Sequence, residues 1–145
     1  MAQDNLNTVM IVNMIDEGKI SVDDLMKIVK LPSLASCLNE MLGKRNLSVE
    51  VVSGLADMNK ATIHKIMNNK MNPSRDILLR LAFALEMTFT ETQVFLKSGN
   101  CAALSGFRKR DLFIIEGITH KRTFDEVNEA LHQHGFHNLY SKKPE

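Results

Sequence analysis

The segment from Ser48 to Pro73 constrains the fold of this chain of 145 residues more than any other segment. Ser48 is a favoured N-cap residue, and apolar residues recur after it at helical spacing, which predicts a first short helix. Asn59 can cap a second short helix, in which Ile63 and Ile66 face inward. The apolar set of the first helix is Val51, Val52, Leu55 and Ala56. The side chains left outside the second helix are those of Lys60, Ala61, Thr62, His64, Lys65 and Asn68.

Two short helices joined by a tight turn, with a polar and cationic outer face on the second, have the plan of a helix-turn-helix that reads DNA. The local charge agrees with this plan, because five cations between residues 59 and 80 stand against the single acid Asp76. Such a local excess favours phosphate binding more than the net charge of the whole chain does. From charge alone, an ordinary solvated surface explains these cations equally well. The five are Lys60, Lys65, Lys70, Arg75 and Arg80.

The composition predicts an all-α fold. The chain has no Trp, one Tyr and nine Met, so aliphatic and thioether side chains must fill the core. Strands with alternating polarity and hairpin turns of the Asn-Gly or Asp-Gly type are not evident. A hydrophobic fraction of 44% is enough for a core in a domain of this length.

Three further helices are expected around the central pair, giving a five-helix domain over residues 33–99. Ser33 opens a helix that runs to about Arg45, and Ser74 caps a helix after the proline. Thr90 and Gln93 fit a capping box for a last short helix that ends before Gly99. The apolar faces of the first two are expected to be Leu34, Cys37, Leu38, Met41 and Leu42, and Ile77, Leu78, Leu81, Ala82 and Leu85.

Helix pairs are expected on both sides of this domain, as extensions over residues 1–32 and 100–145. In the first, residues 4–17 form an amphipathic helix and Ser21 caps a second helix that Pro32 stops. Its stripe of Leu6, Val9, Met10 and Met14 is interpreted as core, with partner binding as the alternative. This pair can pack on the central domain or on a second copy of the chain.

In the C-terminal extension, Thr123 and Glu126 form a capping box for a helix that ends at Gly135. The helix before it has an expected apolar set of Phe107, Leu112, Phe113, Ile115 and Ile118. The basic cluster of residues 108–110 opens that helix against its dipole, so a structural role is favoured, such as Arg110 locking the extension to the domain.

The sequence gives no sign of an enzyme, a cofactor or a metal site. No phosphate-binding loop, nucleophile elbow or His-Glu metal motif is present. His132 and His134 are two residues apart on a helix and face different sides, so they do not chelate together. Cys37 and Cys101 form no metal spacing and, with no leader segment evident, suggest a reduced cytoplasm. No stretch approaches the length of a membrane span.

Residues 34–96 resemble the lambda-repressor and Cro type of helix-turn-helix, the XRE family of bacterial and phage proteins. The resemblance rests on five features: the basic link KRNLS, the cap Ser48, the central Ile63, the loop NPS at 72–74 and the helix LLRLAFALEM. The run FTETQVFL fits the fifth helix of the family, and the C-terminal pair looks like one appended to some bacterial XRE-type proteins.

The resemblance implies that residues 60–68 are a recognition helix in the major groove of double-stranded DNA, where the first residues meet base edges. Phosphate contacts are implied for the helix caps and the following loop. The implied DNA-binding residues are Ser48, Asn59, Lys60, Ala61, Thr62, His64, Lys65, Asn68, Asn69 and Lys70. Because one such helix reads few base pairs, a homodimer on a two-fold site is expected, formed through the N-terminal helices or the C-terminal pair.

Three positions depart from the family pattern. Val49 stands where Gln is common, Ser53 where Ala is common, and Asp57 at the turn position where Gly is common. Two hypotheses therefore follow. The first is a cytoplasmic, sequence-specific transcriptional regulator, and the second is an interaction module that uses the same scaffold to bind a protein partner without DNA.

Overall fold

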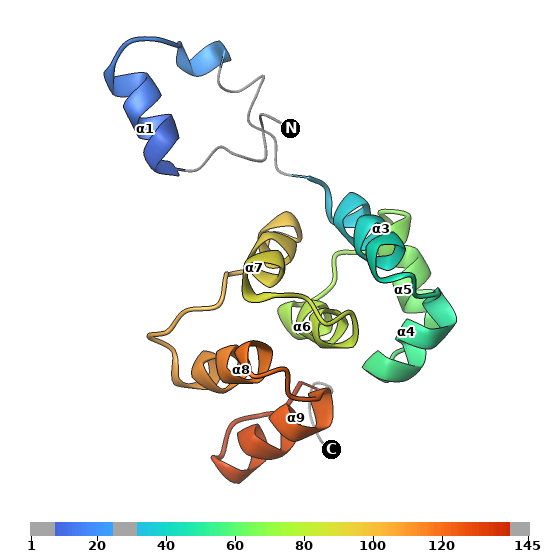
Figure 1. Cartoon of the computed structure of the whole chain (residues 1–145). Helices are drawn as coiled ribbons and strands as arrows, with labels where there is room; N and C mark the ends of the chain where they lie inside the picture. Colours follow the sequence, from blue (N-terminus) through green and yellow to red (C-terminus); the bar gives the residue numbers. More distant parts are fainter. Residues whose placement is uncertain (1–7, 25–31, 140–145) are drawn as a thin grey trace. The chain divides into compact units, whose positions relative to one another are not determined.

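The computed structural model describes residues 8–24 and 32–139 (Figure 1). These residues divide into two compact units, within Met1–Pro32 and Ser33–Glu145. All regular elements of the described residues are helices, so the predicted all-α class is confirmed.

The first unit contains α1 (Thr8–Asp16) and a helical turn at 22–24. The Asp24 amide donates to the Ser21 hydroxyl over 3.1 Å, as expected of a cap. The rest of the predicted second helix, residues 25–30, lies outside the described residues, as does Leu6 of the predicted apolar stripe. Within that stripe Val9 is largely exposed and Met14 is half-buried.

The second unit contains seven described helices. They are α3 (Leu34–Arg45), α4 (Val49–Ala56), α5 (Lys60–Met67), α6 (Arg75–Ala84), α7 (Phe89–Ser98), α8 (Lys109–Thr119) and α9 (Phe124–Gln133). The predicted caps are confirmed at Ser33, Ser48, Asn59, Ser74 and Thr123, where each side chain accepts an amide N–H of the first helical turn.

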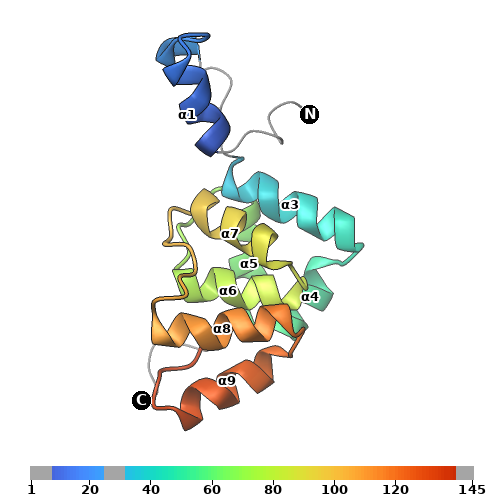
Figure 2. The same cartoon turned by 60° about the vertical axis from the view of Figure 1, so that its left-hand side comes forward.

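The buried helix α6 organises this unit. It packs on α4, α7 and α9, while α3 packs on α5 and α7. Figures 1 and 2 show α8 and α9 together on one side of α6, with α3 on the other side. The core runs through all seven helices, from Leu38 and Ile63 through Leu78 to Ile114 and Leu131.

One local prediction was wrong. The capping box of α7 is formed by Thr88 and Glu91, not by Thr90 and Gln93. The amide side chain of Gln93 instead bonds both backbone groups of Leu104, which ties the loop before α8 to α7.

In the helix of the basic cluster, Phe107 lies before α8 and is fully exposed, and Leu112 is also exposed. The rest of the predicted set does face the core, since Ile118 is buried and Phe113 and Ile115 pack half-buried against it. Ile114 and Gly117 complete the buried face. In α4 the apolar set divides, since Val52 and Ala56 are buried whereas Val51 and Leu55 are half exposed. Helical spacing alone did not indicate which side of either apolar stripe would be covered.

Candidate nucleic-acid interface

The turn between α4 and α5 is set by Asp57. This residue caps α4 in the left-handed region, with φ 52° and ψ 53°. Asp adopts the left-handed conformation more readily than most residues do. It can therefore occupy this turn position, where Gly is common in the family. The hydroxyl of Ser53 donates to the carbonyl of Met58 across the same turn, so Ser53 also has a local role.

Arg80 of α6 stabilises this turn by hydrogen bonds to its backbone. Its guanidinium donates to the carbonyl of Ala56 over 3.1 and 3.2 Å and also to the carbonyl of Asp57. The same guanidinium lies 5.8 Å from the centre of the Phe124 ring on α9. The charge of Arg80 is therefore used to bind the carbonyl groups at the end of α4, not to form part of the basic surface.

Arg75 also turns inward. Its guanidinium forms two hydrogen bonds with the Asp111 carboxylate, of 2.8 and 3.0 Å, and further bonds with the carbonyls of Ala102 and Ala103. Asp111 is 1% exposed. Burial alone would raise its pKa, but the bonds from Arg75 and the Ser105 amide lower the pKa overall.

These contacts reduce the number of cations available to bind phosphate on the helix-turn-helix. Of the five cations between residues 59 and 80, Arg75 and Arg80 serve structural contacts. Asp76 is paired with Arg110, which gives this member of the basic cluster a structural role, although its partner is not the adjacent Asp111. The lysines that remain on the helix-turn-helix are Lys60, Lys65 and Lys70, and all three are exposed.

The residues predicted to contact DNA gather on the outer side of α5. Ile63 and Ile66 fix the rotation of this helix, because they are 0% and 1% exposed. The opposite side carries Lys60, His64 and Asn68 at intervals of four residues, with Ala61 and Lys65 in the neighbouring row. These five residues are exposed and Thr62 is half-buried.

The remaining candidates lie at the ends of the two helices. The Ser48 hydroxyl accepts from the Val51 backbone amide over 3.2 Å. The side-chain amide oxygen of Asn59 accepts from the Ala61 backbone amide over 3.0 Å. Each side chain still has a hydrogen to donate. After α5, Asn69 adopts φ 58° and the Lys70 amide closes the helix on the carbonyl of Lys65. Both side chains are exposed in the loop that follows α5.

Sequence reasoning did not identify Glu50, which shares this surface. One of its carboxylate oxygens lies 3.9 Å from the ammonium nitrogen of Lys60, and both side chains are more than half exposed. Val49 beside it is half-buried and packs against the core, so the position where Gln is common is used here for packing. Glu50 and Asp57 are thus two acids beside the three lysines.

The other polar clusters do not form a metal site. Among residues 8–24 and 32–139, no group of three His, Cys, Asp or Glu side chains is placed to hold a metal ion. His134 stacks on Phe113 with ring centres 4.5 Å apart, and His137 lies 3.4 Å from Asp76. Burial raises the pKa of the Cys37 thiol, in keeping with its predicted role as a small core residue.

No helix within the described ranges is both long and apolar enough to cross a membrane.

Comparison with known proteins agrees with this geometry. Residues 37–92 match a family model described as the Cro/C1-type helix-turn-helix DNA-binding domain. Searches of curated proteins and of solved structures gave no significant match. The matched residues run from α3 into α7 and contain the whole α4–α5 unit, so the match supports a DNA-binding function in general terms. We therefore identify residues 37–92 as a lambda-repressor/Cro-like helix-turn-helix domain of the Cro/C1 type.

Proposed function

We propose that this protein is a sequence-specific transcriptional regulator that reads the major groove of DNA with α5. The observation that carries the proposal is the division of α5 into two sides. Ile63 and Ile66 are buried in the core, whereas Lys60, His64 and Lys65 are exposed on the outer side of the same helix. A helix of about 10–12 Å diameter fits the major groove.

Base contacts are assigned to the first turns of α5. Lys60 has the length to reach a guanine edge, Ala61 offers a methyl group to thymine, and Thr62 can bond a base or a phosphate. Lys65 and His64 follow on the same side and can reach either a base or a phosphate. Thr62 is half-buried, so its hydroxyl has a narrower range of approach than the lysines have.

Phosphate contacts are assigned to the ends of the unit. Ser48 and Asn59 sit at helix N-termini, where backbone amides and their own remaining donors suit an anion. Asn68, Asn69 and Lys70 form the exposed loop after α5 and would contact the other strand of the same groove.

A homodimer on a two-fold related site completes the proposal. One α5 helix reads too few base pairs to select a site in a genome, and a dimer doubles the number read. Exposed apolar residues are available for such an interface on α1 and on the α7–α8 side, among them Val9, Val12, Val94 and Leu112. A regulator of this kind acts on DNA in the cytoplasm of a bacterial cell.

Selection of bound duplexes from a random pool, followed by a salt titration on the selected duplex, tests this function. The affinity is expected to fall steeply as the salt concentration rises, because bound cations are released from the phosphates. Lys60→Ala and Lys65→Ala should each weaken binding, whereas Lys97→Ala on α7 is the matched control and should not. Absence of binding at low salt by the folded chain would overturn the proposal.

The symmetry of the selected sequence tests the dimer separately. A dimer predicts two half-sites in inverted order, and sedimentation in the micromolar range should give twice the mass of one chain. A monomer that selects a single half-site would contradict the dimer but leave DNA reading in place.

One observation favours a second candidate function. Val51 and Leu55 are 48% and 52% exposed on the outer side of α4, next to the acids Glu50 and Asp57. An apolar pair flanked by carboxylates suits a basic protein partner better than it suits phosphate. If the folded chain ignores DNA, an interaction module that uses α4 is the remaining proposal.

A further inference from the structure

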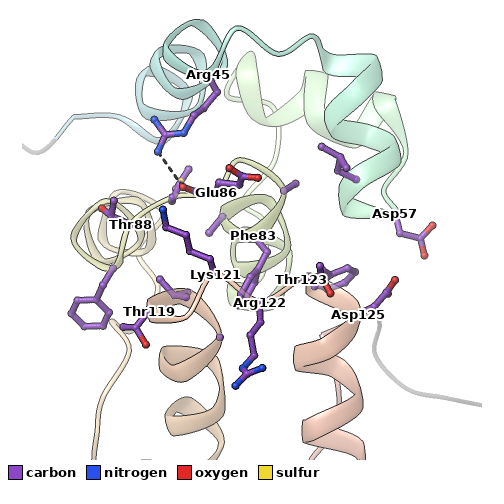
Figure 3. Close-up of a pocket in the computed structure, with 18 of the residues that line it drawn as sticks. Arg45, Asp57, Phe83, Glu86, Thr88, Thr119, Lys121, Arg122, Thr123 and Asp125 are labelled. Carbon is purple, nitrogen blue, oxygen red and sulfur yellow. Dashed lines mark hydrogen bonds between the residues drawn. The ribbon is translucent and has the colours of Figure 1, made fainter.

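A cleft of about 1030 Å³ opens beside the helix-turn-helix within residues 33–139 (Figure 3). It lies where the ends of α4, α6 and α8 meet the beginnings of α7 and α9. The apolar side chains that line it are Leu55, Phe83, Met87, Phe89, Ile118 and Phe124. Its volume is at the upper end of the range of small-molecule sites, so it has room for a drug-sized ligand.

Two of the helix ends that border this cleft, those of α6 and α4, have carbonyl groups that accept from arginine side chains. Arg45 donates to the carbonyls of Leu85 and Glu86 at the end of α6. At the end of α4 the carbonyls of Ala56 and Asp57 accept from Arg80. Repulsion of an anion by these helix ends is therefore reduced.

One cation extends into the cleft from the turn between α8 and α9. Lys121 adopts φ 54°, and its side chain points toward the beginning of α7, near Thr88 (Figure 3). In the part of the chain that the structure describes, no ion pair holds its ammonium group, and the Glu86 carboxylate on the facing turn is likewise without one.

Two of the three acids that line the cleft lie apart from the cation, whereas the third, Glu86, is on the turn that faces Lys121. Figure 3 shows Asp57 and Asp125 at one end, and Lys121 with Thr88 and Thr119 at the other. The Thr88 hydroxyl accepts the Glu91 amide and retains its own hydrogen to donate. A negatively charged group is therefore best received at the Lys121 end, with the apolar body of the same molecule along the helix side chains.

We propose that this cleft binds a small apolar molecule that carries one anionic group, such as an aryl or fatty carboxylate, with the anion held by Lys121. Such a ligand would touch Leu55 and Asp57 of the helix-turn-helix and Phe124 of α9 at the same time. The proposal concerns the cleft alone and does not depend on DNA binding.

A pair of fluorescent dyes separates the charged contact from the apolar one. Anilinonaphthalene sulfonate has an apolar body and one negative charge, and N-phenylnaphthylamine has the same body without the charge. Both are expected to bind the full chain at one site. Lys121→Gln should weaken binding of the sulfonate about two- to fivefold, the range of an ion pair near the surface, and leave the uncharged dye unchanged.

Two further variants make the result specific to the cleft. Lys109→Gln removes an exposed lysine at the other end of α8 and is the matched charge control. Thr119→Trp should fill the Lys121 end and weaken binding of both dyes. The proposal is overturned if neither dye binds at a single site, if Lys121→Gln and Lys109→Gln behave alike, or if the folded Thr119→Trp chain binds both dyes as before.

Discussion

The guanidinium of Arg75 and the buried carboxylate of Asp111 join α6 to α8 through two hydrogen bonds of 2.8 and 3.0 Å. A third bond, from the Ser105 amide to the same carboxylate, fixes the loop that leads into α8. The side chains of Arg75 and Asp111 are 20% and 2% exposed, so removal of one leaves the other poorly solvated. This pair makes the C-terminal helices part of the packed unit around α6.

Asp111→Asn should therefore destabilise the fold. It removes the negative charge and leaves the Arg75 guanidinium buried with only carbonyl partners, which costs about 3 kcal/mol for a pair of this kind. Urea unfolding followed by circular dichroism gives the free energy of unfolding. The matched control is Glu116→Gln, an exposed acid on the same helix, and equal stability of the two variants would contradict the prediction.

Local signals in the sequence predicted the parts of the fold that depend on neighbouring residues. A cap needs only a side-chain oxygen three residues before its amide, so Ser48 and Ser74 could be recognised from position alone. Burial of Ile63 and Ile66 followed from helical spacing in the same way.

Long-range pairs could not be predicted by the same reasoning. Arg75 lies 36 residues from Asp111, and Arg80 lies 24 residues from Ala56, so their partners depend on how the helices pack. The prediction from local charge therefore included both arginines in the basic surface of the helix-turn-helix. The cleft beside Lys121 was missed for the same reason, since residues from six helices line it.

Gly117 of α8 packs against Val127 of α9 with no room for a side chain. A Cβ atom at this position would lie 2.4 Å from a methyl carbon of Val127, which is itself 1% exposed. Gly117→Ala should therefore push the two helices apart and cost about 1–3 kcal/mol of unfolding free energy. Thermal and urea unfolding measure the loss.

Gly43 provides the opposite control, because a Cβ atom there meets no atom within 4 Å. This residue lies within α3, so Gly43→Ala should stabilise the chain by about 0.5–1 kcal/mol through its helix propensity. If Gly117→Ala stabilises the chain as Gly43→Ala does, the α8–α9 contact is looser than described.

Glu91 makes part of the stability depend on acid pH. Burial opposes ionisation of this carboxyl group, but bonds from Lys44 and the Thr88 amide, with the charge of Arg45, lower its pKa from 4.5 to about 2. A group whose pKa is lower in the folded chain contributes stability above its unfolded pKa and loses it as the pH falls toward the folded value. The contribution should be complete above about pH 5 and decline between pH 4.5 and 2.

Glu91→Gln isolates this contribution. The variant should be less stable than the parent chain at neutral pH, and the difference should shrink as the pH is lowered from 5 toward 2. Urea unfolding at several pH values measures it, with Glu129→Gln on the exposed side of α9 as the control. A difference that stays constant over this range would show that the charge of Glu91 does not contribute.

Glu50 should weaken the proposed binding of DNA, because its carboxylate lies 3.9 Å from the ammonium nitrogen of Lys60 on the same exposed surface. In the free chain this exposed pair contributes little to stability, so Glu50→Gln should leave unfolding nearly unchanged. On a duplex the same substitution removes an acid near the phosphates and releases Lys60 to contact them. The affinity for a selected duplex at low salt should rise about two- to tenfold.

Fluorescence anisotropy measures the change, and Glu116→Gln on α8 controls for the loss of one negative charge elsewhere. If both variants bind DNA with the same affinity, Glu50 and Lys60 do not face the duplex, and α5 would have to meet DNA from another side or not at all.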